Sequence, residues 1–221
     1  MKVCTDSCLF GAWIADKLKK KDLDAKRILD IGTGTGLLSL MLAQKTNAQV
    51  DAVEINGDAF MQAKENVDSS PWKKSIHIFH DDIKTWRPGK KYDLIICNPP
   101  FYENDLKSPQ AAKNVSKHSK ALTLDELFSS VGELLDENGT FAVLLPFHRN
   151  DFSAKAAQKN SLFASEKLHI RQSDSHDYFR SIIILQKEKR SPTVNEISIN
   201  NNVNGYTKSF TALLKDYYLA L

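Results

Sequence analysis

The chain has 221 residues, of which 42% are hydrophobic and 26% are charged, with a formal net charge of +3. This length suits one α/β domain covering residues 1–221, and the mildly basic charge is compatible with an RNA substrate. The absence of a leader-like segment or an apolar run of spanning length excludes membrane classes and predicts a cytoplasmic protein. The three cysteines and six histidines have no disulfide or ligand spacing, so we expect no metal.

The first strong pattern is a glycine-rich loop between a strand and a helix. An apolar run at residues 28–31 contains Asp30, and a helical pattern follows at residues 37–42. The loop between them has Gly32, Gly34 and Gly36 in G-x-G-x-G spacing. Glycines permit positive φ and let backbone N–H groups approach a ligand closely. The spacing alone is weak evidence, but strand–loop–helix is the context that a nucleotide-containing cofactor requires.

Two further acidic signals follow at the ends of the next predicted strands. The strand at 49–55 contains Glu54, whose carboxylate can accept hydrogen bonds from both hydroxyls of a ribose. NAD and S-adenosylmethionine both carry that ribose, so Glu54 does not separate them. After a helix at 59–67, a strand at 76–79 precedes Asp82 and Ile83, which could meet the adenine amine and ring of the cofactor. The alternative for Asp82 is a helix cap or a solvated turn.

The fourth signal is Asn98-Pro99-Pro100-Phe101, directly after the apolar strand at 94–97. Consecutive prolines make a rigid turn that cannot continue a sheet ladder. The Asn98 side-chain oxygen and the Pro99 carbonyl can each accept one hydrogen from an exocyclic NH2 group, while Phe101 stacks on the attached ring. We therefore assign catalysis to Asn98, Pro99 and Phe101. An ordinary proline-terminated strand is the alternative.

A basic stretch follows, at residues 102–120, beside the point where a target base would enter. Two explanations remain open, a lid that contacts phosphates and a solvated loop on a lysine-rich surface. We assign Pro100 and six residues of this stretch to substrate binding: Tyr102, Lys107, Lys113, Lys117, His118 and Lys120.

The remaining elements alternate between helices and strands. A helix at 124–135 has Thr123 as its N-cap with Glu126 three residues on, and Asn138-Gly139 ends it. Strand 140–145, helix 153–164 and two hairpin strands at 167–171 and 181–187 follow. Strand candidates at 196–199 and near residue 206 precede a helical tail at 209–219.

Taken together, the glycine loop, Glu54, Asp82 and the Asn-Pro-Pro-Phe motif end four successive strands. Ligands of open α/β sheets bind at those carboxyl ends. This order resembles the S-adenosylmethionine-dependent methyltransferases that modify exocyclic amines of nucleobases or a protein glutamine. The resemblance implies a Rossmann-like class I fold, a doubly wound and mostly parallel seven-stranded sheet with an antiparallel hairpin strand. It also implies S-adenosylmethionine as the cofactor.

The two ends of the chain narrow the family. Residues 1–13, MKVCTDSCLFGAW, and the tail at 206–218 resemble the corresponding segments of bacterial tRNA(Val) adenine N6-methyltransferases. In that family residues 1–25 would cover the cofactor, with Thr5 and Asp6 at its carboxylate and amine ends and Leu9 lining the pocket. The family usually has a short strand-forming stretch upstream, so we expect an N-terminally shortened chain. Three positions depart from the family pattern: Cys4, Ser7 and Cys8.

The resemblance implies transfer of a methyl group to the N6 amine of a tRNA adenine, the anticodon-adjacent adenosine at position 37 of tRNA(Val), with no membrane and no obligate protein partner. Asp30, Gly32, Gly34, Gly36, Glu54, Asp82, Ile83 and Asn98 would hold the cofactor. A guanine-N2 or glutamine-N5 methyltransferase is the alternative with the same chemistry. A non-catalytic RNA-binding module is an alternative of another class, and a nicotinamide oxidoreductase leaves the Asn-Pro-Pro-Phe motif unexplained.

Overall fold

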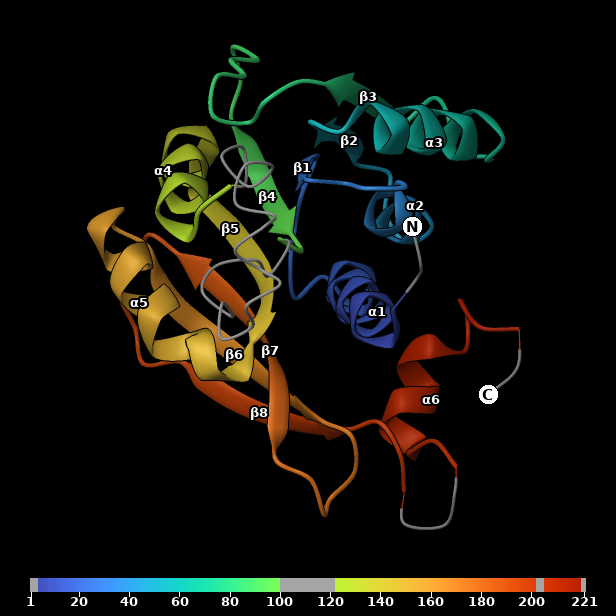
Figure 1. The fold of residues 1–221 in the computed structure, drawn as a ribbon, viewed down its shortest axis with the longest axis vertical. Coiled ribbons are helices and arrows are strands. Elements are labelled where there is room, and N and C mark those ends of the chain that lie inside the picture. The colour runs from blue at the N-terminus through green and yellow to red at the C-terminus, as the bar shows by residue number, and fades with distance from the viewer. Residues whose placement is uncertain (1–3, 100–121, 202–204, 220–221) are drawn as a thin grey trace, which may run out of the picture.

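The computed structural model describes residues 4–99, 122–201 and 205–219. One eight-stranded sheet forms its centre, with the order β3-β2-β1-β4-β5-β7-β6-β8 (Figure 1). The strands are β1 (Arg27–Ile31), β2 (Gln49–Glu54), β3 (Ile76–His80), β4 (Tyr92–Cys97), β5 (Leu135–Pro146), β6 (Phe163–Arg171), β7 (Tyr178–Gln186) and β8 (Thr193–Ser198).

Only β7 runs against its neighbours, since it pairs antiparallel with both β5 and β6 while the other described pairs are parallel. The predicted Rossmann-like class I fold with an antiparallel hairpin strand is thus confirmed. The sheet has one strand more than the seven expected, because β8 adds to the edge of β6. Residue 206 forms only an isolated bridge with Asn200.

Helices cover both faces of the sheet (Figure 1). On one face lie α1 (Thr5–Lys20), α2 (Leu37–Ala43), α3 (Gly57–Asp68) and α6 (Lys208–Leu214), and on the other α4 (Leu124–Leu134) and α5 (Asn150–Lys159), which follows the 3-10 turn η2 (Phe147–Arg149). Strand side chains alternate between two apolar clusters, so that Ile96 joins α1 and α2 whereas Ile95 joins α4. None of the helices in the described ranges is long and apolar enough to cross a membrane.

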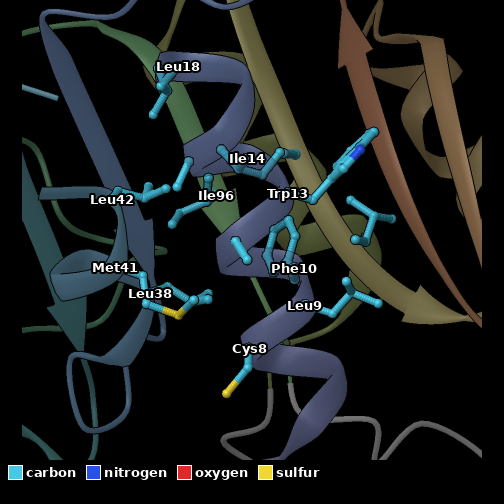
Figure 2. Packing of buried hydrophobic residues seen from close by; sticks show 14 of the residues in the cluster. Cys8, Leu9, Phe10, Trp13, Ile14, Leu18, Leu38, Met41, Leu42 and Ile96 are labelled. Carbon is cyan, nitrogen blue, oxygen red and sulfur yellow. The ribbon is translucent and has the colours of Figure 1, made fainter. Parts of the chain in front are cut away.

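Helix α1 is packed deeply against α2 (Figure 2). Phe10 and Leu9 are fully buried, and Gly11 faces α2 so closely that an added Cβ would lie 2.7 Å from the Met41 sulfur. The helix ends at Lys21 in the left-handed conformation, with lysines in its last turn. This packing places the first turn of α1 beside the carboxyl end of β4.

Several boundaries differ from the prediction, and the tail expected to be helical over 209–219 is a helix over Lys208–Leu214. Helix α4 has the predicted capping box at Thr123 and Glu126, but it ends at Leu134, before Asn138. Strand β5 therefore begins at Leu135, with a register shift against β4 where the chain passes Gly139. Helix α5 ends at Lys159 rather than 164, because Ser161 turns at a φ of 55° into β6.

Candidate cofactor and amine site

The strand register brings the predicted signals to one sheet edge. Ile31 at the end of β1 is level with Val53 on β2 and Cys97 on β4, and Glu54 is level with His80 on β3. The glycine loop, Glu54, Asp82 and Asn98 therefore follow four neighbouring strands at the same edge, as predicted.

The glycine loop adopts the backbone conformation that its composition allows. Gly32, Gly34 and Gly36 all have positive φ, at 67°, 61° and 82°. A Cβ added at Gly32 would meet no heavy atom within 4 Å. The loop is tied to the end of β2, since the Gly32 N–H donates to the Val53 carbonyl at 2.9 Å. Space thus lies open over Gly32, where a ligand could approach the backbone.

Glu54 is buried beside this loop and acts as an acceptor. Its Oε2 accepts the Gly34 N–H at 2.9 Å, and its Oε1 accepts the Asn56 N–H at 2.8 Å. Each carboxylate oxygen has a second lone pair, so both can still accept a ribose hydroxyl. The Glu54 carboxylate thus holds the glycine loop in place and can still accept hydrogen bonds from the two hydroxyls of a ribose.

Asp30 lies under the loop with no exposed surface. Its Oδ2 accepts from the Thr33 hydroxyl at 2.6 Å and the Ser39 hydroxyl at 2.7 Å, while its Oδ1 is buried without a hydrogen-bond partner in the described structure. Burial raises the pKa of Asp30 from 3.8 to about 6, the two hydroxyls counteract this, and the nearby Glu54 adds to it. Thr33 and Ser39 were not among the predicted residues, although hydroxyls flanking a glycine loop could have indicated them.

The predicted adenine contacts lie after β3. Asp82 is partly buried, and its Oδ1 accepts the Lys84 N–H at 3.0 Å, as in a turn. Ile83 is buried in the cluster under α4. Beside them His80 stacks on Phe60 with ring centroids 5.1 Å apart, and its Nε2–H donates to the Ile55 carbonyl at 3.2 Å.

Asn98 ends β4 with its side-chain amide between α1 and the sheet edge. Its Nδ2 donates to the Ser7 hydroxyl at 2.8 Å. Its Oδ1 is buried and has no partner among the described residues. Pro99 is buried, and burial raises the pKa of the Cys97 thiol well above its usual range, so that thiol stays neutral. A buried acceptor of this kind is normally satisfied by an N–H or O–H group, which a ligand could supply here.

The three residues assigned to the N-terminal cover have different environments. Thr5 is exposed, Leu9 is buried in the core, and the Asp6 carboxylate accepts from Arg180 Nε at 2.9 Å. No sequence signal indicated Arg180, which is 174 positions away on β7. Eight predicted residues lie outside the described ranges: Pro100, Phe101, Tyr102, Lys107, Lys113, Lys117, His118 and Lys120.

The donor and acceptor set fits S-adenosylmethionine. Open space over Gly32 and the buried acceptor Glu54 suit its ribose and backbone contacts, and Asp30 keeps a buried oxygen without a partner among the described residues. In the described ranges, no group of three histidine, cysteine or acidic side chains could hold a metal ion.

Comparisons with known proteins agree with this geometry. A family model, methyltransferase small domain, matches residues 11–145. A tRNA1(Val) (adenine(37)-N6)-methyltransferase of Dyadobacter fermentans is 39% identical over 99% of this chain and 91% of its own length. The corresponding protein of Parabacteroides distasonis is 35% identical over 100% of this chain and 92% of its own length.

Solved structures show the same fold at low identity. A predicted O-methyltransferase of Agrobacterium tumefaciens superposes with a TM-score of 0.71 at 15% identity, covering 94% of both chains. An S-adenosylmethionine-dependent methyltransferase of Clostridium acetobutylicum superposes with a TM-score of 0.61 at 14% identity, over 82% of this chain and 92% of its own.

Proposed function

The chain belongs to the family of tRNA1(Val) (adenine(37)-N6)-methyltransferases, and on that premise we propose that it methylates the N6 amine of adenine 37 in tRNA(Val). The methyl donor is S-adenosylmethionine, and the reaction takes place in the cytoplasm, where tRNA is found. The observation that carries the proposal is the Asn98 Oδ1, a buried acceptor that follows β4 and has no partner in the part of the chain that the structure describes.

The cofactor supplies an electrophilic methyl group on a sulfonium. Glu54 accepts hydrogen bonds from the ribose hydroxyls, and the loop at Gly32 lets the ligand approach the backbone closely. Asp82 would accept a hydrogen bond from the cofactor's adenine amine, and Ile83 would pack on the adenine ring. Thr5 and Asp6 bind the amino-acid end. These contacts fix the donor, leaving the Asn98 side of the edge for the target base.

The target adenine is turned out of its stack to reach this edge. Asn98 Oδ1 and the Pro99 carbonyl each accept one hydrogen of the N6 amine, and Phe101 stacks on the base. The amine is then held in line with the transferable carbon. Methyl transfer would form the bond between N6 and the methyl carbon and break the carbon–sulfur bond, whose electrons would stay on sulfur, and the proton leaving N6 would go to water.

Methyl transfer to unmodified tRNA(Val) transcript, followed by nucleoside mass spectrometry, tests the proposal. Wild-type protein should form N6-methyladenosine at position 37. Asn98→Ala should lower kcat on the order of a hundredfold, as for the loss of one preorganised polar group, with S-adenosylhomocysteine affinity unchanged by calorimetry. Asn195→Ala, on the exposed edge of β8, is the control. Methylation of guanine or of a protein glutamine, or cofactor binding without any turnover, would contradict the assignment.

A further inference from the structure

Ser7 contacts Asn98 across 91 positions of sequence. Ser7 lies in the first turn of α1, and its hydroxyl oxygen accepts a hydrogen bond from Asn98 Nδ2 at 2.8 Å. This contact joins the N-terminal helix to the residue that faces the target amine in the proposed function. Neither the sequence motifs nor the family match gives Ser7 a role.

The direction of that hydrogen bond matters because the two ends of an amide differ. The Asn98 oxygen can only accept hydrogen bonds and its nitrogen can only donate them. The exocyclic NH2 group of adenine becomes more nucleophilic when a neighbouring oxygen accepts one of its hydrogens. If the Asn98 amide were turned round, its own NH2 group would face adenine and could accept no hydrogen bond. With its nitrogen held by Ser7, the amide leaves Oδ1 buried and without a partner among residues 4–99, 122–201 and 205–219.

Ser7 is itself held in place from two directions. Its backbone N–H donates to Asp6 Oδ1 at 3.0 Å, and the other oxygen of Asp6 accepts from Arg180 on β7 at 2.9 Å. Residues Cys8 to Ala15 of the helix are buried, and the helix packs against α2 (Figure 2). The hydroxyl is therefore presented from a rigid element, as a precisely oriented hydrogen bond requires.

We propose that Ser7 is a positioning residue for methyl transfer: it anchors the Asn98 amide so that Oδ1 faces the target amine. The expected effect of Ser7 on turnover rests on the proposed function. The hydrogen bond that anchors Asn98 is a property of the free protein and does not depend on that function. Removing the hydroxyl releases the amide, which then rotates and presents its N–H end for part of the time. Turnover falls although the cofactor contacts are intact.

The anchoring is measured without any turnover. In the free protein, the two side-chain N–H signals of Asn98 are assigned in a nitrogen–proton NMR spectrum by their loss in Asn98→Ala. Ser7→Ala should shift both signals and speed their exchange with water by roughly threefold to tenfold, the range for one lost hydrogen bond. Ser7→Thr, which keeps the hydroxyl, should restore both properties. Unchanged Asn98 signals in Ser7→Ala would overturn the proposal.

Kinetics test the consequence. Ser7→Ala should lower kcat roughly threefold to tenfold while S-adenosylhomocysteine affinity and thermal stability change little, and Ser7→Thr should recover the rate. In an Asn98→Ala background, Ser7→Ala should have no further effect. Ser209→Ala, an exposed serine in the first turn of α6, is the matched control.

The possible failures are distinguishable. A wild-type protein that methylates no tRNA contradicts the proposed function, and the NMR experiment then still decides whether Ser7 anchors Asn98. Equal kcat in Ser7→Ala and wild type, or additive losses in the double variant, would show that Ser7 does not act through Asn98.

Discussion

Asp6 and Arg180 form an ion pair with 2.9 Å between Oδ2 and Nε, although they are 174 positions apart in sequence. The pair ties the first turn of α1 to β7, while Ser7 of the same turn contacts Asn98, the residue after β4. The first turn of α1 thus contacts both β7 and the residue after β4, at the sheet edge where cofactor and target base are expected to meet.

Asp6 is predicted to bind the amine end of the cofactor, and Asp6→Asn separates this role from the structural one. Loss of the negative charge should weaken S-adenosylhomocysteine binding about tenfold, because a charge-assisted hydrogen bond to the ammonium is lost. Methylthioadenosine lacks the amino-acid end, so its affinity should not change. Calorimetry with both ligands measures this.

Asp16→Asn is the control for that comparison, because Asp16 lies on the same helix and pairs with Lys20 at 2.7 Å, away from the sheet edge. Equal weakening of both ligands in Asp6→Asn would mean that Asp6 acts only through its bond to Arg180.

The open space over Gly32 gives a prediction with a close internal control. Gly32 and Gly89 both have a φ of 67°, and at both an added Cβ would meet nothing within 4 Å. Alanine at either position should destabilise the fold by about 1 kcal/mol, the strain of a left-handed residue. Only Gly32→Ala should also abolish cofactor binding by calorimetry, because only that methyl group points into the cofactor site. Intact binding in Gly32→Ala would remove the glycine loop from the site.

The sequence allowed prediction of those parts of the site that strand ends and local turns determine. Glycine spacing, Glu54 and Asn98 each follow a predicted strand, and parallel pairing then brings strand ends to one edge whatever the connections between them. The capping box at Thr123 and Glu126 was predictable for the same reason, because capping involves residues three positions apart.

Contacts between distant elements were not predictable in this way. Nothing local to Arg180 or Asp6 indicates that β7 and α1 meet, since this depends on how both pack on the sheet. The end of α4 was misplaced because tertiary pairing of Leu135 with Tyr92 starts a strand before the local stop signal at Asn138-Gly139 is reached. Strand β8 had a recognisable pattern at 196–199, but its partner β6 could not be inferred from it.

Asp30 predicts a specific pH dependence of stability. Its pKa is 3.8 ordinarily and about 6 in the folded protein. Between these values the unfolded chain has lost the proton while the folded protein keeps it. The contribution of Asp30 to the free energy of unfolding therefore falls as pH rises through this window and is constant above it.

Asp30→Asn removes this titration while keeping an oxygen that accepts from Thr33 and Ser39. The unfolding free energy of the variant minus that of wild type should rise by about 2 kcal/mol between pH 4 and pH 7, and then remain constant to pH 8. Urea denaturation at each pH measures it. A difference that is the same at all pH values would show that Asp30 titrates normally.

The basic stretch after the Asn-Pro-Pro-Phe motif carries the last prediction. A tRNA must be held by its phosphates while one base is extruded, and Lys107, Lys113, Lys117 and Lys120 are the nearest basic cluster in sequence. Phosphate contacts add affinity without reading bases, and each one steepens the dependence of binding on salt. Replacing all four by glutamine should weaken tRNA binding and flatten the slope of log affinity against log salt by roughly three.

The slope of log affinity against log salt distinguishes direct phosphate contacts from a general effect of net charge. A control variant replaces four exposed lysines that precede strands and thus lie at the opposite edge of the sheet: Lys26, Lys73, Lys74 and Lys91. Both variants change the net charge equally, so the long-range attraction to tRNA is weakened in both. Only lysines that contact phosphates directly release counterions on binding, so only their replacement should flatten the slope. Equal slopes in the two variants would make residues 102–120 a solvated loop. S-adenosylhomocysteine affinity should be unchanged in both, because the proposed cofactor contacts lie in the first turn of α1 and after β1, β2 and β3, outside both sets of lysines.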